Sequence, residues 1–299
     1  MDKLDDINGL LDSIGAPEHE HKHEYDVAII DGGGIVHPCF AIVRKDDALP
    51  DDALIREVCS LFWGTVDPYL DDGAECVIAW DPKDNRDYRA AILPCYKHGR
   101  GARDPLLRGS MIEIFKQARA KGYRQVIVPG YEADDAIASL VREMRATRRV
   151  LIVSEDRDLH QLVGDNVRQA HPRAGITCDE AVIETRSEHS AEDHTARKAI
   201  KGDTGDNVRG LPGVGEKKAD AILVVYPDFV DDCQGGAVEW NRLPADILKA
   251  LIGAGQLMVH PVRSKADKRV CREVDALVVV RDAVRETYRL VALEDGLGV

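Results

Sequence analysis

Aromatic side chains and long apolar runs are scarce in this sequence. Aromatic residues make up 5% of the 299 residues, so a folded core has to be built mainly from Val, Ile, Leu and Ala. There is no run of about 18 consecutive apolar residues, which excludes a membrane-spanning helix. The acidic N-terminal stretch contains no apolar segment of the kind that a secretory signal needs, so we expect no such signal.

Cysteines with the spacing of a metal ribbon are also missing. The seven cysteines are scattered, odd in number and never arranged as C-x-x-C. This pattern argues against a disulfide scaffold and against a zinc ribbon. It favours reduced thiols, and we therefore expect a cytoplasmic protein.

Negative charge, in contrast, is in excess. Forty basic residues against 53 acidic ones leave a formal net charge of −13, in a chain that is 44% hydrophobic and 31% charged. That composition is globular, and the length predicts one or two domains. An acidic chain is not an obvious nucleic-acid-binding protein, so the positions of the charges have to decide the question.

Short Val/Ile-rich runs alternate with stretches long enough for helices. The runs lie within residues 26–31, 75–81, 124–135 and 148–158, and the helical stretches within 51–64, 106–121 and 134–146. This alternation predicts an α/β fold with a central, mostly parallel sheet flanked by helices. Residues 165–172 and 180–185 are candidate edge strands, and residues 242–259 have an amphipathic helical pattern.

Acidic residues lie at or just after the end of all four strand-like runs. They are Asp31, Asp81, Glu132, Asp134, Asp135, Asp156 and Asp158. A single Asp after a strand is common, because Asp is favoured in turns and at helix N-caps. In a parallel sheet, however, the carboxyl ends of the strands share one edge, so the set predicts one cavity whose clustered negative charge requires a cation. Mg²⁺ and Mn²⁺ prefer such oxygen ligands.

A basic segment stands out against this acidic background. Residues 83–108 contain seven Lys and Arg residues and only three Asp residues. Beside a carboxylate cluster, such a segment suits a phosphate-containing substrate. Tyr96 is a candidate for stacking on a terminal base, and Arg103 is a candidate for a DNA contact. A solvated charged loop is the alternative interpretation.

A glycine-rich segment over residues 201–219 is the third feature. Its characteristic residues are Gly210, Gly213 and Gly215, followed by Lys217 and Lys218. The glycines permit tight turns and close backbone approach, and a helix is predicted to begin near Glu216. A helix dipole disfavours lysines in the first turn, so we expect both lysines to face DNA phosphates. A 262–272 stretch is also basic and is a further candidate for duplex contact.

Four segments resemble motifs of the 5′-nuclease family, which includes flap endonucleases, phage 5′→3′ exonucleases and the 5′-nuclease domain of bacterial DNA polymerase I. They are ILPCYKHGR, YEADDAIASL, VSEDRDLHQLV and GDTGDNVRGLPGVGEKKA, in the order of the family. With Asp31, the resemblance covers about the middle two thirds of the chain. It implies a PIN-like nuclease core over residues 25–195 with a helical arch at 83–110. A tail over 1–24 precedes the core, and a helix–three-turn–helix and helical region over 196–299 follows it.

The resemblance also implies roles for individual residues. The implied metal ligands are Asp31, Asp81, Glu132, Asp134, Asp135, Asp156, Asp158, Asp203 and Asp206. Two or more Mg²⁺ or Mn²⁺ ions are implied at these ligands, and a potassium ion at the glycine hairpin. Lys97 and Arg100 match the pair that steers the phosphate, and Arg89 matches a further basic position. The implied activity is 5′→3′ exonuclease or flap endonuclease action by a monomer on branched or 5′-ended duplex DNA, with RNA–DNA hybrids as a further candidate substrate.

Two departures from the family pattern are visible. The first motif reads DGGGIVHPC, and no basic residue follows Asp31 until Arg44. Any phosphate contact expected from that position is therefore in question. Asp206 follows Gly205, where the family usually has Ser, which is a small change.

Three alternatives to a 5′ nuclease of DNA fit the same residues less well. A catalytically weak protein that binds branched DNA is disfavoured because the acidic set is complete. An RNA-directed nuclease of the related PIN-like fold is disfavoured because such chains typically lack the glycine hairpin. A purely structural α/β protein leaves the clustered acidic residues unexplained.

Overall fold

A computed structural model describes most of the chain. The described residues are 24–45, 49–70, 73–83, 85–98, 101, 104–179, 181–183, 191–259, 273–293 and 296–299. Nearly all of the predicted N-terminal tail and the basic stretch 262–272 therefore lie outside the described residues. No described helix is long and apolar enough to cross a membrane.

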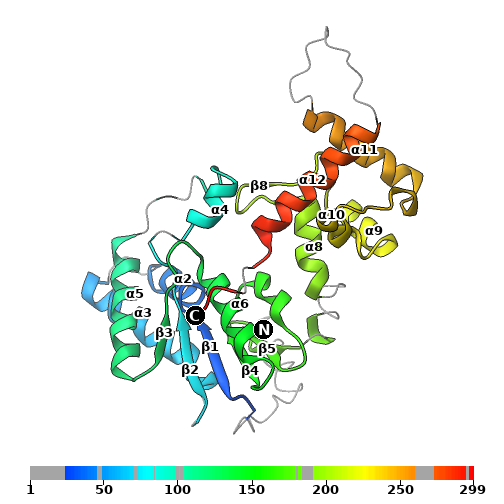
Figure 1. Ribbon diagram of the computed structural model, residues 1–299. Helices are drawn as coiled ribbons and strands as arrows, with labels where there is room; N and C mark the ends of the chain where they lie inside the picture. The colour runs from blue at the N-terminus through cyan, green and yellow to red at the C-terminus, as the bar shows by residue number, and fades with distance from the viewer. Residues whose placement is uncertain are drawn as a thin grey trace, which may run out of the picture.

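Six strands form the main sheet, in the order β3-β2-β1-β4-β5-β6 (Figure 1). They are β1 (Val27–Asp31), β2 (Glu75–Ala79), β3 (Arg124–Val126), β4 (Val150–Val153), β5 (Val167–His171) and β6 (Ile176–Cys178). The first five are parallel to one another, and β6 is antiparallel to β5. The predicted mostly parallel sheet is thus confirmed.

Neither predicted edge strand is observed as an edge strand. Residues 165–172 contain β5, but β5 pairs with both β4 and β6 and so lies inside the sheet, whose antiparallel edge strand is β6. The described part of the second candidate, residues 181–183, is not a strand. The chain turns back early, because Gly175 adopts a left-handed conformation with φ of 62° in a tight turn after His171. Residues 181–183 instead form a helical turn, which the Asp179 side chain caps by accepting a hydrogen bond from the Val182 N–H at 2.9 Å.

Helices cover both faces of the sheet. One face carries α2 (Gly32–Val43), α3 (Asp51–Val66) and α5 (Pro105–Ala120), and the other carries α6 (Ala133–Met144). The alternation of side chains along β1 assigns the faces, since Ala28 and Ile30 pack under the three-helix layer while Val27 and Ile29 pack under α6. All three predicted helical stretches of this core are confirmed.

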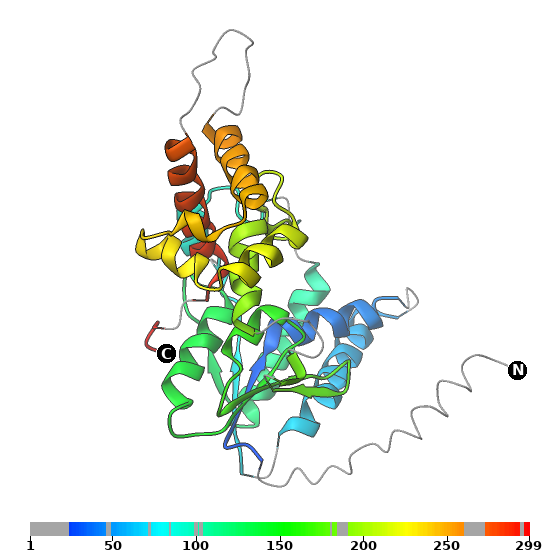
Figure 2. The same cartoon turned by 90° about the vertical axis from the view of Figure 1, so that its right-hand side faces the viewer.

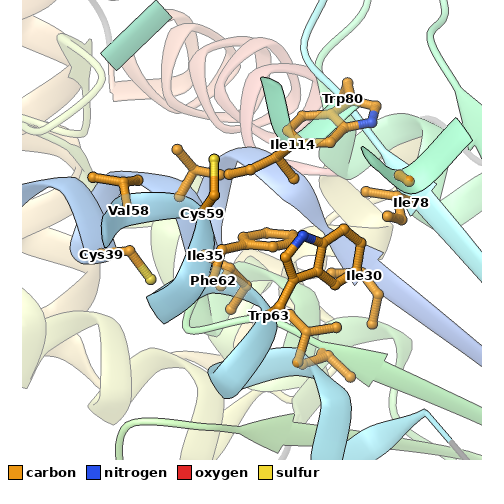
Figure 3. Packing of buried hydrophobic residues seen from close by; sticks show 14 of the residues in the cluster. Ile30, Ile35, Cys39, Val58, Cys59, Phe62, Trp63, Ile78, Trp80 and Ile114 are labelled. Atoms are coloured by element: carbon orange, nitrogen blue, oxygen red, sulfur yellow. The ribbon is translucent and has the colours of Figure 1, made fainter. Parts of the chain in front are cut away.

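The few aromatic residues are concentrated in the three-helix layer. The Phe62 ring stacks on Trp80 with a centroid distance of 6.4 Å and meets Trp63 edge-on at 5.1 Å (Figure 3). The Trp80 indole donates a hydrogen bond to Gln125 Oε1 at 3.0 Å, so its polar atom is satisfied although the ring is buried. These rings fill the space between the sheet and α3.

The last third of the chain builds a second, helical body (Figure 2). Its elements are α8 (Ala191–Lys201), β7 (Gly202–Asp203), β8 (Val208–Arg209), α9 (Glu216–Val225), α10 (Phe229–Gly235), α11 (Ala245–Val259) and α12 (Glu273–Val291). They enclose a separate apolar cluster that includes Tyr226, Phe229 and Leu251. After α12 the chain returns to the α/β body, where Leu293 and Val299 pack against the α6 layer.

Candidate functional site

The connections of the sheet place a crevice at the end of β1. From β1 the chain moves to β2 and β3 on one side, and β4 then lies on the other side of β1. Ligands of such sheets bind where the strand order reverses in this way, beyond the carboxyl ends of the strands. Asp31 is the last residue of β1, and Asp156 follows β4.

Ser154 ties these two strand ends together. Its hydroxyl donates to Asp31 Oδ2 at 2.7 Å and accepts the Asp156 N–H at 3.0 Å. Ser154 is fully buried. Sequence analysis did not single it out, and the only signal for it was its position two residues before Asp156 in the VSEDRD motif.

The glycines of the first motif make room for the Asp31 carboxylate. The Gly34 N–H donates to Asp31 Oδ1 at 2.7 Å, and Asp31 is the N-cap of α2. A Cβ atom at residue 34 would overlap that carboxylate, and one at residue 32 would lie 2.6 Å from the Trp80 ring. At residue 33 a Cβ would make ordinary contacts with Asp31 and Asp81, at 3.8 and 3.9 Å. The unusual DGGG sequence therefore has a steric function at two of its three glycines.

The N-terminus of α6 contributes further carboxylates. Glu132 is its N-cap, and Asp134 lies half-buried in its first turn. The Asp81 side chain accepts the Ala133 N–H at 3.0 Å, which links the end of β2 to this helix. Acidic groups are stabilised at a helix N-terminus, where unpaired N–H groups and the dipole are positive.

Two adjoining cavities collect the acidic side chains. One of about 390 Å³ is lined by Asp31, Asp81, Glu132, Asp134 and Asp156. The second, of about 530 Å³, is lined by Glu132, Asp134, Asp156, Asp158, Asp203 and Asp206. Lys97 lines both. The structure thus brings together eight of the nine expected ligands, and the exception is Asp135.

Three of these carboxylates, which we call the open carboxylates, form no salt bridge with any described residue. They are Asp31, Asp134 and Asp156. Burial, with added repulsion from Asp156 and Asp81, raises the pKa of Asp31 to about 6. Burial raises the pKa of Asp134 well above its usual range, and the charges of Asp31 and Asp156 raise it further.

The pKa of Asp156 is also raised, although this residue is exposed. Desolvation by the cavity walls raises its pKa, and the charge of Asp158 adds to the effect. The pKa values of all three are raised mainly by burial, and repulsion from neighbouring carboxylates adds to it. A cation bound among them would stabilise their charged forms. Hard divalent cations, with their preference for several carboxylate oxygens, fit this donor set.

Five other acidic residues, the paired carboxylates, are neutralised by basic side chains of the protein. They are Glu132, Asp135, Asp158, Asp203 and Asp206. Lys198 Nζ lies 2.5 Å from Asp158 Oδ1 and 2.7 Å from Asp203 Oδ2. Burial alone would raise the pKa of Asp158, but His194 and Lys198 hold it at about 2. Lys198 and His194 belong to α8, and sequence analysis missed both.

Lys97 and Tyr96 both contact Glu132 and Asp206. Lys97 Nζ lies 2.6 Å from Glu132 Oε1 and 3.5 Å from Asp206 Oδ2. The Tyr96 hydroxyl donates to Glu132 Oε2 at 2.8 Å and also lies 3.2 Å from Asp206 Oδ2. The expectation that Tyr96 stacks on a base is wrong for this structure, because its ring is 4% exposed and packs against Val208 and Leu290.

Asp135 lines neither cavity, contrary to the role expected for it. Arg89 binds both of its carboxylate oxygens, at 2.6 and 2.8 Å, and both side chains are buried. Asp135 also accepts the Glu132 N–H at 3.1 Å and so closes the capping box of α6. Arg89 further donates to the carbonyl of Leu290 at 2.9 Å. The pair therefore joins the short helix α4 (Asp87–Ile92), α6 and α12. Arg89 itself lines the second cavity and lies 3.4 Å from Glu132 Oε2.

The glycine hairpin contains the close backbone approach and the tight turn that its sequence predicts. A Cβ at Gly210 would overlap the backbone of Lys201 and Gly202, and Gly213 has a φ of 75°. Gly215 is the N-cap of α9, which begins at Glu216 as predicted. Lys217 and Lys218 are exposed, and Lys218 Nζ donates to the Gly213 carbonyl at 2.8 Å. Arg100 and Arg103 lie outside the described residues.

Known proteins resemble this chain in sequence and in fold. Residues 26–192 match the family model described as 5′-3′ exonuclease, N-terminal resolvase-like domain. The DNA polymerase I of Mycobacterium tuberculosis is 36% identical over 225 residues, which is 73% of this chain and 25% of that protein. A 5′-3′ exonuclease of Streptomyces coelicolor is 32% identical over 159 residues, or 48% of this chain and 52% of that one.

A solved structure shows the same fold. The T5 D15 protein, co-crystallised with metal ions, superimposes with a TM-score of 0.59 at 21% identity, covering 90% of this chain and 89% of that one. Of the sequence relatives, the DNA polymerase I proteins are much longer, and this chain spans about a quarter of their length.

Proposed function

The chain belongs to the 5′-3′ exonuclease family, and we propose that it is a divalent-metal-dependent 5′ nuclease that hydrolyses phosphodiester bonds in branched or 5′-ended duplex DNA. The single observation that carries the proposal is the set of open carboxylates at the strand-order reversal. Three carboxylates that repel each other, in cavities also lined by Lys97, form a cation site beside a phosphate-binding group.

The proposed ligands divide between the two cavities. The first cavity is lined by Asp31, Asp81, Glu132, Asp134 and Asp156. The second is lined by Glu132, Asp134, Asp156, Asp158, Asp203 and Asp206. Mg²⁺ or Mn²⁺ ions bound there would supply an activated water and stabilise charge on the phosphate oxygens. Asp135 is left out of the ligand set because Arg89 occupies both of its oxygens.

The remaining residues have positioning tasks under this proposal. Ser154 and the Gly34 N–H hold the Asp31 carboxylate in one orientation, which limits the reorganisation needed when a cation binds. Lys97 is held by Glu132 and offers the cavity a positive charge for a substrate phosphate. Arg100 is proposed as its partner on the strength of the sequence motif alone.

Duplex DNA is proposed to lie along the helical body, over the glycine hairpin. Exposed Lys217 and Lys218 and the backbone of residues 210–215 contact phosphates without reading sequence. A potassium ion at this hairpin belongs to the same proposal. The division into a nuclease core over residues 25–195 and a DNA-binding region over 196–299 is supported by the separate apolar cluster of the second part.

A cleavage assay tests this function. The purified protein is incubated with a 5′-labelled flap substrate, a matching blunt duplex and a flap with an RNA 5′ segment, each in Mg²⁺ and in EDTA. Release of short 5′ products only with the metal is expected, and the ratio among substrates defines the preference. The absence of cleavage in Mg²⁺ and Mn²⁺, together with a retained gel shift of the flap DNA, would overturn the proposal in favour of a branched-DNA-binding protein.

A further inference from the structure

A cluster of two histidines and one cysteine lies outside the carboxylate cavities. Its members are His160, His171 and Cys178, and one nitrogen of each histidine and the sulfur of the cysteine all lie within 4.8 Å of one another. The Nε2 atoms of the two histidines are 3.0 Å apart, and the rings meet edge-on. None of these residues has a task in the proposed nuclease reaction.

Three different elements bring the cluster together. His160 is on the short 3-10 helix η2 (Arg157–Leu162), His171 is the last residue of β5 and Cys178 is the last residue of β6. In the β5–β6 ladder Gln169 is opposite Cys178. Because alternate residues of a strand share a face, His171 and Cys178 are diagonal neighbours on one face of this ladder, and His160 closes over them from η2.

We propose that His160, His171 and Cys178 form a second metal site, selective for a borderline-soft divalent ion such as Zn²⁺ and distinct from the carboxylate site. Imidazole nitrogen and thiolate sulfur are the ligands that zinc prefers, whereas Mg²⁺ and Mn²⁺ prefer oxygen. Two nitrogens about 2.0–2.1 Å from one tetrahedral ion are separated by about 3.3 Å. The two histidine nitrogens form a hydrogen bond of 3.0 Å, which is close to that spacing, and the cysteine sulfur lies within 4.8 Å of a nitrogen of each histidine.

The surroundings permit entry of an ion. The three residues line one cavity of about 780 Å³, so the cluster is reached from solvent although His171 and Cys178 are 7% and 2% exposed. Four positive side chains also line this cavity, and three of them are paired with carboxylates: Arg197 with Asp220, Lys198 with Asp158 and Lys201 with Glu216. The fourth, Arg157, is exposed to solvent. His194 also lines this cavity, but its Nε2 lies 2.9 Å from Asp158 Oδ1. The thiol and the two imidazoles of the cluster are the ligating groups that lie close together, and a water can fill the fourth position.

The site would also connect the sheet edge to the nuclease centre. His160 and Asp158 are two residues apart at the start of η2, so an ion held by His160, His171 and Cys178 fastens this helix to β5 and β6. Its role is then to support the position of the Asp158 side chain, as bound metals commonly support the segments that carry their ligands.

Metal content measures the site directly. Full-length protein is stripped with EDTA, incubated with Zn²⁺ in the presence of excess Mg²⁺, desalted and analysed by elemental mass spectrometry. About one zinc ion per chain is expected for the wild type and for Asp134→Asn, and a loss of most of that zinc for Cys178→Ser. Cys39→Ser is the matched control, because Cys39 is another buried thiol, in the three-helix layer, and it should retain the ion.

Cobalt provides a spectroscopic arm. Co²⁺ bound at the cluster should give a thiolate-to-metal charge-transfer band that Mg²⁺ does not displace and that Cys178→Ser abolishes. If circular dichroism shows that Cys178→Ser does not fold, His160→Gln decides, since His160 is at the partly exposed side of the cluster. A wild type that retains no zinc, or a folded Cys178→Ser or His160→Gln protein that retains as much as the wild type, would overturn the proposal.

Discussion

The open and the paired carboxylates lie at the same end of one sheet but differ in how their charge is balanced. Asp31 and Asp134 are surrounded by other acids, and their pKa values are raised. Asp158 and Asp203 share Lys198, and their pKa values are lowered. Burial raises the pKa in both groups, so burial alone does not separate them. In the paired group a neighbouring cation outweighs burial, and in the open group an external cation is needed to do so.

Removing one open carboxylate should have the largest effect. Asp134→Asn is expected to lower flap cleavage by about 10³-fold or more, because a lost ligand removes several kcal/mol of charge stabilisation at the phosphate. The same change relieves repulsion in the metal-free protein, so its melting temperature in EDTA should rise. Cleavage rates and thermal melts of one preparation measure both. Asp52→Asn, which removes an exposed acid paired with Arg56, should change neither the cleavage rate nor the melting temperature. An Asp134→Asn protein with wild-type activity would contradict the distinction between open and paired carboxylates.

Breaking a paired carboxylate should act on stability instead. Arg89→Met leaves the buried Asp135 without its cation, and loss of one partner of a buried pair costs about 3–5 kcal/mol of the free energy of unfolding. Urea denaturation of Arg89→Met, Asp135→Asn and the double variant gives the coupling between the two side chains. A strong coupling is expected. Additive effects of the two single changes would show that the ion pair contributes little.

Moving an open carboxylate without removing it should give an intermediate effect. Gly34→Ala forces the Asp31 side chain to shift, since the added Cβ overlaps it, whereas Gly33→Ala makes only ordinary contacts. We expect a cleavage rate about 10- to 100-fold lower for Gly34→Ala, as for other losses of a ligand's supporting contacts, and a smaller loss for Gly33→Ala. Rates at saturating Mg²⁺ compare the two. Equal activities would mean that the orientation of Asp31 is unimportant.

The smallest effect is a pH dependence of stability. The pKa of Asp31 is about 6 in the folded protein and 3.8 ordinarily, so between these values the folded state binds more protons than the unfolded state. Its contribution to stability is therefore present below about pH 3.8 and is lost as the pH rises through 6. In EDTA, Asp31→Asn should become more stable than the wild type as the pH is raised from 4.5 to about 7, measured by melting temperature. A difference that shrinks over this range would contradict the assignment.

The sequence predicted where the acidic side chains converge but not how each is neutralised. Apolar runs of strand length that end in Asp or Glu were sufficient to predict the parallel sheet and the acidic cavity at its edge. Lys198 and Arg89, in contrast, are 40 and 46 residues from the acids that they bind, and such contacts depend on how α8 and α4 pack. Tyr96 is buried for the same reason, because Leu290 of α12 covers it. The His160, His171 and Cys178 cluster has no local spacing that marks it.

Counting bound ions in matched variants tests the central claim most directly. Calorimetric titration of the stripped protein with Mn²⁺, in wild type, Asp134→Asn and Asp135→Asn, compares an open with a paired carboxylate one position apart in the same helix. Asp134→Asn is expected to lose at least one of about two ions bound by the wild type, and a folded Asp135→Asn to retain both. A wild type that binds no Mn²⁺, or a folded Asp135→Asn that loses its ions as Asp134→Asn does, would contradict the account.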